Sequence, residues 1–338
     1  MPTSVNDIKI SVLMPAYNTE KYIAEAIQSV LVQSFPYFEL IVINDGSTDK
    51  TSQIITSFKD PRVVLVNQSN GGVAKALNHG LRIARAQYIV RFDADDVCRQ
   101  DRLRIQYDFM QSNPDYILSG SDAEYIDMNG EYIFSFKCMA HSDAEIRELP
   151  LECCPFLHVA VIFKRQEVIN AGGYNEDAHT FEDHLLWAML IKNGRVKNLT
   201  ESLVQVRFNP ESVTIDESWR GQRFKQIKYN AILNGYVCPD EAKELQQIIK
   251  QQNNSGIKNG SYYSLLAKEY LWNNYHPKKA RKNIFELIKI HPFNMQAYFM
   301  WTLSFFPPAF VKALYNKTKV IINRTKQGEA VNKIQSGR

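Results

Sequence analysis

The sequence predicts an α/β protein with a mostly parallel sheet, flanking helices and a helical region toward its C-terminal end. Two observations support this prediction. Over the first 120 residues, short runs rich in Val and Ile alternate with longer segments of helical periodicity, a pattern typical of βαβ units. Beyond Asp216, helical patterns rich in Lys, Gln, Asn and aromatic residues replace the alternation. We therefore expect an α/β domain over residues 1–215 and a helical region with a basic tail over residues 216–338.

The individual elements follow from the hydrophobic pattern. Apolar runs without polar alternation indicate strands that are buried on both faces, over residues 8–14, 40–43, 63–66 and 88–92. Apolar stripes at helical spacing predict helices over residues 21–33, 48–58 and 73–86. Further strands are predicted over residues 132–136, 159–163 and 203–208, with a helix over residues 182–191 and a linker over residues 253–260.

Composition and charge exclude several classes of protein. A chain of 338 residues with 45% hydrophobic residues can bury a substantial core, and a net charge of +4 is too small to indicate nucleic-acid binding. From Lys312 onward, however, seven Lys or Arg residues stand against one Glu. Five cysteines without a C-x-x-C pair indicate a reducing compartment. Since we find neither a signal peptide nor an apolar stretch of bilayer length, we expect a cytoplasmic protein.

The strongest chemical signal lies directly after the strand predicted at residues 88–92. Asp93, Asp95 and Asp96 follow Arg91 and Phe92, so three carboxylates occur within four residues. Such carboxylates repel one another, and a hard divalent cation with oxygen ligands relieves the repulsion. Mg²⁺ or Mn²⁺ held in this way completes its coordination with substrate phosphates, so the segment predicts a phosphate-bearing substrate. The alternative is a turn whose acids cap the helix that begins near residue 101.

Parallel sheets bind ligands beyond the carboxyl ends of their strands, so the residues that follow each strand are candidate ligand contacts. Asp45 is suited to accept a hydrogen bond from the ring N–H of uracil or thymine, with the Tyr17 ring against the base. Gly72 brings backbone close to a ligand and Lys75 adds positive charge. The alternatives are a turn with Ser47 as a helix N-cap and a loop with a solvated Lys. The candidates for donor binding from these loops and from the segment after residue 90 are Pro15, Ala16, Tyr17, Asn18, Asp45, Gly72, Lys75, Arg91 and Asp93.

A second group of candidates comes from the middle of the chain. Asp183 is suited to act as a general base toward an incoming hydroxyl, although Thr180 and Asp183 also have the spacing of a helix capping box. Glu182 stands beside it. His158 is a further candidate, but a single His at the start of an apolar strand is more often a core residue. Arg207 is placed to face a phosphate together with Ser212 and Thr214, and an ordinary edge strand accounts for it equally well.

Together and in this order, these segments resemble the family 2 glycosyltransferases, which have the Rossmann-like GT-A fold and transfer a sugar from a nucleoside diphosphate with inversion at the anomeric carbon. The resemblance extends over about residues 8–215. It implies that Asp93 binds the nucleoside side of the donor, that Asp95 holds the metal and that Asp183 is the catalytic base. It also implies base and ribose contacts from Pro15, Ala16, Tyr17 and Asp45. The matching segments are residues 11–18, 44–49, 70–72, 78–80, 91–96, 102–106, 172–174 and 182–187.

Three features depart from the family pattern. Leu77 stands where many relatives carry Arg, so Lys75 would supply that charge. Asn209 stands where relatives often have His. The Q-x-x-R-W motif of processive synthases is absent, which favours the addition of one sugar per encounter.

We therefore expect a metal-dependent inverting glycosyltransferase that moves a sugar from a UDP- or dTDP-sugar to a glycan or a lipid-linked oligosaccharide in bacterial surface polysaccharide synthesis. Two alternatives come from other classes. A sugar nucleotidyltransferase would typically carry a Gly-rich basic loop after the first strand, where this chain has Pro-Ala-Tyr-Asn. A non-catalytic module that binds nucleotide-sugars is the second.

Aromatic residues beside the basic tail suggest a helix that lies on the anionic cytoplasmic face of the membrane. The alternative is a helix packed on the catalytic domain with a frayed basic end. The aromatic residues are Tyr298, Phe299, Trp301, Phe305 and Phe306.

Overall fold

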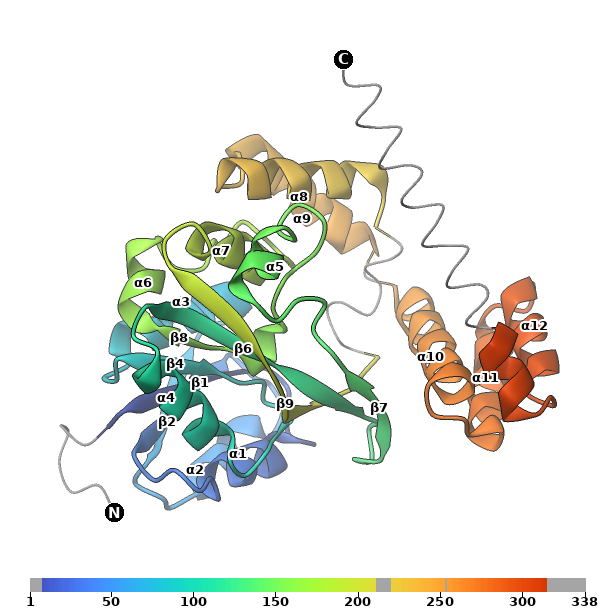
Figure 1. Cartoon of the computed structure of the whole chain (residues 1–338), viewed down its shortest axis with the longest axis horizontal. Helices are drawn as coiled ribbons and strands as arrows, with labels where there is room; N and C mark the ends of the chain where they lie inside the picture. Colours follow the sequence, from blue (N-terminus) through green and yellow to red (C-terminus); the bar gives the residue numbers. More distant parts are fainter. Residues whose placement is uncertain (1–7, 211–219, 253, 315–338) are drawn as a thin grey trace. The chain divides into compact units, whose positions relative to one another are not determined.

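The computed structural model describes residues 8–210, 220–252 and 254–314 (Figure 1). The chain forms two compact units, one comprising Met1–Phe208 with Glu217–Gln252 and the other comprising Asn209–Asp216 with Asn253–Arg338. Helices α8 (Gln222–Asn234) and α9 (Pro239–Gln252) therefore belong to the first unit, although both lie in the predicted helical region. The functional boundary predicted after residue 215 stays a prediction.

The first unit is built on a mixed sheet, which has nine strands within the described residues. Strands β1 to β4 form its parallel half in the order β3-β2-β1-β4, followed by β8, β6, β9 and β5, and β7 pairs with β6. Their bounds are β1 Ile10–Ala16, β2 Phe38–Asp45, β3 Val63–Gln68, β4 Tyr88–Arg91, β5 Val97–Cys98, β6 Tyr116–Ile126, β7 Tyr132–Phe136, β8 Ile162–Lys164 and β9 Arg195–Arg207.

Helices cover both faces of this sheet. Side chains alternate along β1, so that Val12 packs with α1 on one face while Leu13 packs with α3 on the other. Gly80 lets α3 approach closely, because a Cβ there would lie 3.0 Å from Cδ1 of Ile43. The helices of this part are α1 Ile23–Leu31, α2 Thr51–Ser57, α3 Val73–Ile83, α4 Arg102–Ser112, α5 Asp143–Arg147, α6 Arg165–Asn170, α7 Glu182–Leu190 and the 3₁₀ turn η2 His158–Ala160.

The predicted fold class is confirmed, and the first four strands and three helices lie where they were predicted. Strand β6 was not predicted. Its sequence places Ser119, Ser121 and Asp122 at buried positions, so polar residues in the middle of the strand hide the apolar pattern. The strand predicted over residues 159–163 was partly wrong, because its first two residues belong to η2 and β8 begins at Ile162.

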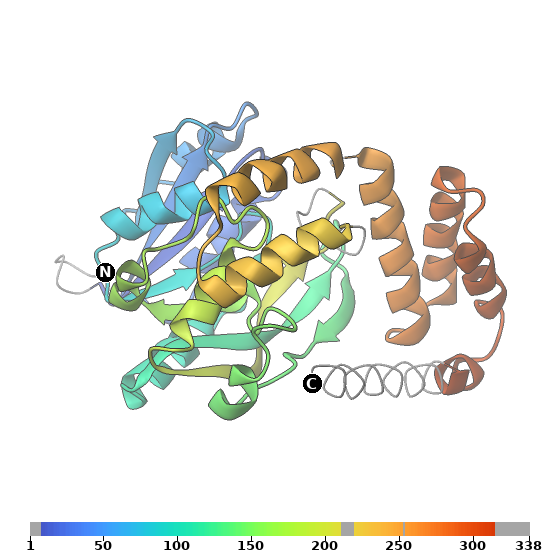
Figure 2. The same cartoon turned by 90° about the horizontal axis from the view of Figure 1, so that it is seen from above.

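The second unit contains the helices α10 (Ser255–Trp272), α11 (Pro277–Ile290) and α12 (Met295–Leu303), which lie side by side in Figures 1 and 2. The linker predicted over residues 253–260 was wrong from Ser255 onward. The Asn254 side chain accepts a hydrogen bond from the Gly256 amide and caps α10. A Cβ on Gly260 would lie 2.4 Å from His291 Nε2, so this glycine serves helix packing. None of the described helices meets the length and hydropathy needed to span a bilayer.

A buried arginine joins the carboxyl end of β4 to η2. Arg102 on α4 donates hydrogen bonds to the carbonyl oxygens of Arg91 (2.9 Å) and Val159 (2.8 Å). Gln106, one turn further along α4, accepts from Arg102 Nε and donates to the carbonyl of Ala160 at 2.8 Å. Because both side chains are fully buried, they set the distance between the acidic segment after β4 and the segment that carries His158.

Candidate active site

Strands β1, β2, β3 and β4 run parallel, so their carboxyl ends meet at one side of the sheet, which we call the carboxyl edge. Asp45, the last residue of β2, is buried there and holds the glycine loop, residues 69–72. Its Oδ1 accepts from Gln68 Nε2 (2.7 Å) and the Gly71 amide (2.9 Å), and its Oδ2 accepts from the Gly72 amide (2.8 Å). Both oxygens of Asp45 thus already accept hydrogen bonds within the protein. The predicted contact of Asp45 with a nucleotide base stays a prediction.

The loops after β1 and β2 also bind each other. Asn18 has a left-handed backbone (φ 51°), donates its amide to Ser47 Oγ at 3.0 Å and accepts from the Thr48 amide at 2.8 Å. Ser47 is therefore not the N-cap that its pattern predicted; helix α2 begins after Lys50 and has no side-chain cap. Tyr17 is half-exposed beside this junction, with 50% of its surface accessible. Lys75 lies exposed in the first turn of α3.

Asp93, Asp95 and Asp96 form the acidic loop at the end of β4. One carboxylate oxygen from each lies within 4.8 Å of the others. Asp96 is buried, and burial together with the negative charges of Asp95 and Asp93 raises its pKa well above the usual range. Three converging oxygen donors with unfavourable mutual repulsion fit a hard divalent cation such as Mg²⁺ or Mn²⁺.

Arg207 at the end of β9 supports the acidic loop. The Arg207 amide donates to Asp96 Oδ1 at 2.7 Å, and its guanidinium donates to the Asp95 carbonyl oxygen at 2.8 Å and to Glu25 Oε2 at 2.7 Å. The guanidinium also lies over the Tyr22 ring, 4.6 Å from its centroid. These contacts hold the loop, whereas the predicted phosphate contact of Arg207 stays a prediction. Ser212 and Thr214, predicted beside it, lie outside the described residues.

Arg91 connects the acidic loop to the second group of candidates. It is buried and forms an ion pair with Asp93 through Nη1. Within the described part of the chain, Arg91 Nε has no hydrogen-bond partner. Burial raises the pKa values of Glu182 and Asp183, and the positive charge of Arg91 lowers both of them. The same buried cation therefore pairs with Asp93 and acts electrostatically on Asp183.

Asp183 lies in the first turn of α7, with its two carboxylate oxygens in different surroundings. Oδ1 accepts from the His184 amide at 2.7 Å, whereas Oδ2 lies 3.7 Å from Cys154 Sγ and 4.0 Å from His158 Nδ1. Burial raises the pKa of Asp183, which favours its use as a base near neutral pH. The predicted capping box is wrong, because Phe181 is the N-cap and Thr180 Oγ1 instead accepts from Arg220 at 2.8 Å.

Sequence reasoning did not assign roles to three residues of this site. Tyr174 is buried beside His158, with its Oη 3.1 Å from His158 Nε2. Cys154 donates to Asp183, and the positive charge of Lys228 on α8 lowers the pKa of Asp183. The two glycines before Tyr174 were the available signal. Both have positive φ, as a chain that must turn sharply to place the next side chain requires.

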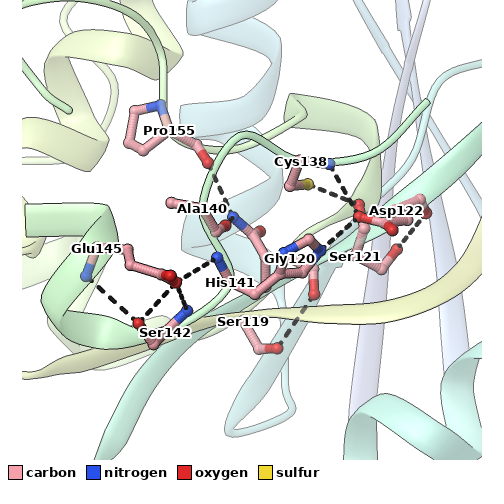
Figure 3. A network of polar contacts seen from close by, with 11 residues as sticks. Ser119, Gly120, Ser121, Asp122, Cys138, Ala140, His141, Ser142, Glu145 and Pro155 are labelled. Carbon is pink, nitrogen blue, oxygen red and sulfur yellow. Dashed lines mark hydrogen bonds and ion pairs between the residues drawn. The ribbon is translucent and has the colours of Figure 1, made fainter.

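A second polar network fixes the segment after β7 (Figure 3). Asp122 on β6 accepts from the Cys138 amide at 2.9 Å and lies 2.9 Å from His141 Nε2. Asn198 on β9 donates to the carbonyl oxygens of Ala140 and Pro155, each at 2.9 Å. The segment from Cys138 to Pro155, which leads to His158, is therefore hydrogen-bonded to both β6 and β9.

Residues 11–165 match the family described as Glycosyl transferase family 2. The chain is 31% identical over 206 residues to an uncharacterized glycosyltransferase of Rickettsia conorii, covering 61% of this chain and 34% of that protein, so it spans about a third of that relative. It is 30% identical to the amylovoran biosynthesis glycosyltransferase AmsE of Erwinia amylovora, covering 62% of this chain and 80% of AmsE. It is 31% identical to a UDP-Gal:alpha-D-GlcNAc-diphosphoundecaprenol beta-1,3-galactosyltransferase of Escherichia coli, covering 60% and 76%.

Solved structures share the fold at low sequence identity. TarS 1-349 of S. aureus in complex with UDP-GlcNAc superimposes with a TM-score of 0.52 at 18% identity, covering 92% of each chain. The mannosyltransferase PcManGT of Pyrobaculum calidifontis, in complex with GDP-Man and Mn2+, gives a TM-score of 0.51 at 18% identity, covering 91% of this chain and 88% of that one. Both likenesses confirm the predicted fold.

The buried Glu182 predicts a pH-dependent stability. Burial and the adjacent Asp183 charge raise its pKa from 4.5 to about 7. The unfolded chain therefore ionises Glu182 at a lower pH than the folded chain, and folding becomes less favourable as the pH rises between these values. We expect Glu182→Gln to gain free energy of unfolding relative to wild type between about pH 5 and pH 8, on the order of 3 kcal/mol.

Urea denaturation at both pH values measures this difference, with the exposed Glu148→Gln as the matched control. An equal difference between wild type and Glu182→Gln at both pH values would contradict the raised pKa.

Proposed function

The chain belongs to glycosyltransferase family 2, and on that premise we propose that it transfers one sugar from a UDP- or dTDP-sugar to a hydroxyl group of a glycan or lipid-linked oligosaccharide, with inversion, in the synthesis of a bacterial surface polysaccharide. The observation that carries the proposal is the shared position of Asp93 and Asp183 around the buried Arg91. It supports a site in which donor diphosphate and acceptor hydroxyl meet.

Asp95 would hold Mg²⁺ or Mn²⁺, with Asp93 toward the nucleoside side of the donor and the buried Asp96 in the same cluster. When bound, the cation would stabilise the negative charge that develops on the departing diphosphate. The glycine loop, which Asp45 orders, and the exposed Lys75 would lie toward the donor. The name of the E. coli relative, with UDP-Gal as donor, and the Mn2+ complex of PcManGT support this choice of donor and metal.

Asp183 would act as the base through Oδ2, the oxygen that does not accept from the His184 amide. Oδ2 takes the proton from the acceptor hydroxyl while the hydroxyl oxygen forms a bond to the anomeric carbon. The bond between that carbon and the diphosphate oxygen breaks, and the nucleoside diphosphate leaves with its electron pair. Attack opposite the leaving group inverts the anomeric configuration.

The acceptor class rests on the names of relatives. AmsE is named for amylovoran biosynthesis and the E. coli relative for a diphosphoundecaprenol-linked substrate. Both names support a glycan or lipid-linked acceptor for this chain. Family membership disfavours the alternative of a sugar nucleotidyltransferase. A non-catalytic binding module is distinguished by its failure to release UDP.

A lipid-linked acceptor would bring the enzyme to the cytoplasmic face of the membrane, and the second unit carries a suitable surface. Helix α12 buries Ala297, Met300 and Leu303, yet its opposite face is also apolar. Over residues 273–314, six Lys or Arg residues stand against one Glu, so this part would favour anionic lipid. We call the following exposed side chains of this part the aromatic surface: Phe293 (93% accessible), Tyr298 (43%), Phe299 (55%), Phe305 (65%), Phe306 (41%) and Phe310 (49%), with the non-aromatic Met295 (78%).

Of the residues predicted to touch the membrane, Tyr298, Phe299, Phe305 and Phe306 are exposed and Trp301 is half-buried. The basic tail beyond residue 314 lies outside the described residues.

Asp183→Asn should abolish sugar transfer but leave donor binding intact. The amide is nearly isosteric with the carboxylate but cannot take a proton, so we expect kcat for UDP release to fall about a hundredfold or more, with little change in UDP affinity. Asp177→Asn, an exposed substitution on the preceding loop, is the matched control. Turnover close to wild type in Asp183→Asn would reject Asp183 as the base.

Asp95→Ala should remove the metal-dependent part of donor binding. Titration of UDP with and without Mn²⁺ measures how much the metal strengthens UDP binding. We expect this Mn²⁺-dependent increase in UDP affinity to fall about tenfold or more when a carboxylate ligand is lost. Asp108→Ala, on the exposed face of α4, is the control. If Mn²⁺ strengthens UDP binding equally in Asp95→Ala and wild type, Asp95 does not hold the metal.

The aromatic surface should bind anionic vesicles. We expect the protein to float with phosphatidylcholine vesicles that contain phosphatidylglycerol, and Phe299→Ser with Phe306→Ser to lose most of that fraction, because each buried ring contributes about 2 kcal/mol. Leu233→Ser, an equally exposed apolar residue of the first unit, should float like wild type. Unchanged flotation of the double variant would show that another surface binds lipid.

A further inference from the structure

We propose that His158, held by Tyr174, is a positioning residue for Asp183 that presents its Nδ1–H to Oδ2, the oxygen that receives the acceptor proton. The inference deepens the proposed function and rests on it. It concerns the partly buried His158 and the buried Tyr174, for which neither composition nor spacing indicated a joint role.

The two oxygens of Asp183 differ in how they are held. Oδ1 is fixed by the His184 amide at 2.7 Å, whereas among the described residues Oδ2 has the weak thiol donor of Cys154 at 3.7 Å. His158 Nδ1 lies 4.0 Å from Oδ2. An approach of about 1 Å would bring this pair to the usual hydrogen-bond distance of about 3 Å. Without such a donor, the orientation of the basic oxygen depends on Oδ1 alone.

The contact with Tyr174 selects the tautomer of His158. Burial and the Arg91 charge lower the pKa of His158, so the imidazole is neutral and carries one proton. Burial raises the pKa of Tyr174, so its hydroxyl keeps its proton. If Tyr174 Oη donates to Nε2 across their 3.1 Å contact, the ring proton sits on Nδ1 and faces Asp183. The reverse arrangement would place the Nδ1 lone pair against a carboxylate, which is unfavourable.

Tyr174 is itself fixed by the helix α3. Asn78 Oδ1 accepts from the Tyr174 amide at 2.9 Å, and Asn78 Nδ2 donates to the Tyr174 carbonyl oxygen at 2.8 Å. Gly173 admits this close approach, since a Cβ there would lie 2.7 Å from Asn78 Oδ1. The Trp187 ring packs edge-on against both partners, at 5.9 Å from the His158 ring and 6.2 Å from the Tyr174 ring. The imidazole is therefore held in one orientation.

Other charged and titratable groups also face Asp183, so the contribution of His158 has to be separated from theirs. Glu182 precedes Asp183 on α7. The charges of Lys228 and Arg91 lower the pKa of Asp183, and the Cys154 thiol donates to Asp183 Oδ2. A hydrogen bond to the ionised carboxylate lowers its pKa. Removing the Nδ1–H donor should therefore raise the pKa of Asp183 and move the acidic limb of the kcat profile to higher pH.

The test compares His158→Leu, His158→Asn and Tyr174→Phe by the release of UDP from UDP-sugars, or of dTDP from dTDP-sugars, across pH, with water or an added glycan as acceptor. His158→Leu should lower kcat about tenfold or more and shift the acidic limb upward, with an unchanged donor KM. His158→Asn should recover most of both effects, because its side-chain amide can occupy the place of Nδ1–H. Tyr174→Phe should shift the limb in the same direction by less.

An unshifted acidic limb in His158→Leu, or an Asn variant as impaired as the Leu variant, would overturn the inference. Should His158→Leu fail to fold, the limb of Tyr174→Phe decides: a shift supports the inference and its absence overturns it. If the wild-type protein releases no UDP or dTDP from any of these donors, the proposed function itself fails. Release by wild type and all variants with one common pH profile overturns only the positioning role.

Discussion

The structure depends on holding a surplus of negative charge at the carboxyl edge of one sheet. Asp93, Asp95 and Asp96 crowd the end of β4, and Asp183 joins them from α7. Two buried guanidinium groups make this arrangement possible. Arg207 fixes the backbone of the acidic loop, and Arg91 pairs with Asp93 while its charge lowers the pKa of Asp183. A buried charge without a partner is costly, so neither arginine can be lost without disturbing the acids that it serves.

Much of what resembles the family in this sequence serves to hold backbone in place. Asn18 fastens the loop after β1 to the loop after β2, Asp45 fastens the glycine loop, and Asn78 fastens Tyr174. Each is a short polar side chain that accepts hydrogen bonds from the backbone of another segment. Roles in ligand binding come in addition to this framework. A substitution at one of these positions would therefore combine a change in the site with a change in its support.

The sequence alone predicted the parallel half of the sheet because its strands are continuous apolar runs, and it predicted the acidic loop because that signal lies in four consecutive residues. It did not predict β6, whose buried Asp122 has its partners elsewhere in the chain. The two predicted caps, at Ser47 and Thr180, failed for the same reason. Asn18 and Arg220 took the groups that local pattern assigned to helix ends. Cys154 and Lys228 reach Asp183 only through tertiary packing.

The bonds between Asp45 and the glycine loop have a thermodynamic consequence. Gly71 and Gly72 would otherwise be the most mobile part of the edge, because glycine has the largest backbone freedom to lose. Their amides are already anchored by Asp45. The conformational entropy of this loop is therefore lost when the protein folds. A ligand that binds there does not lose affinity to the cost of ordering the loop.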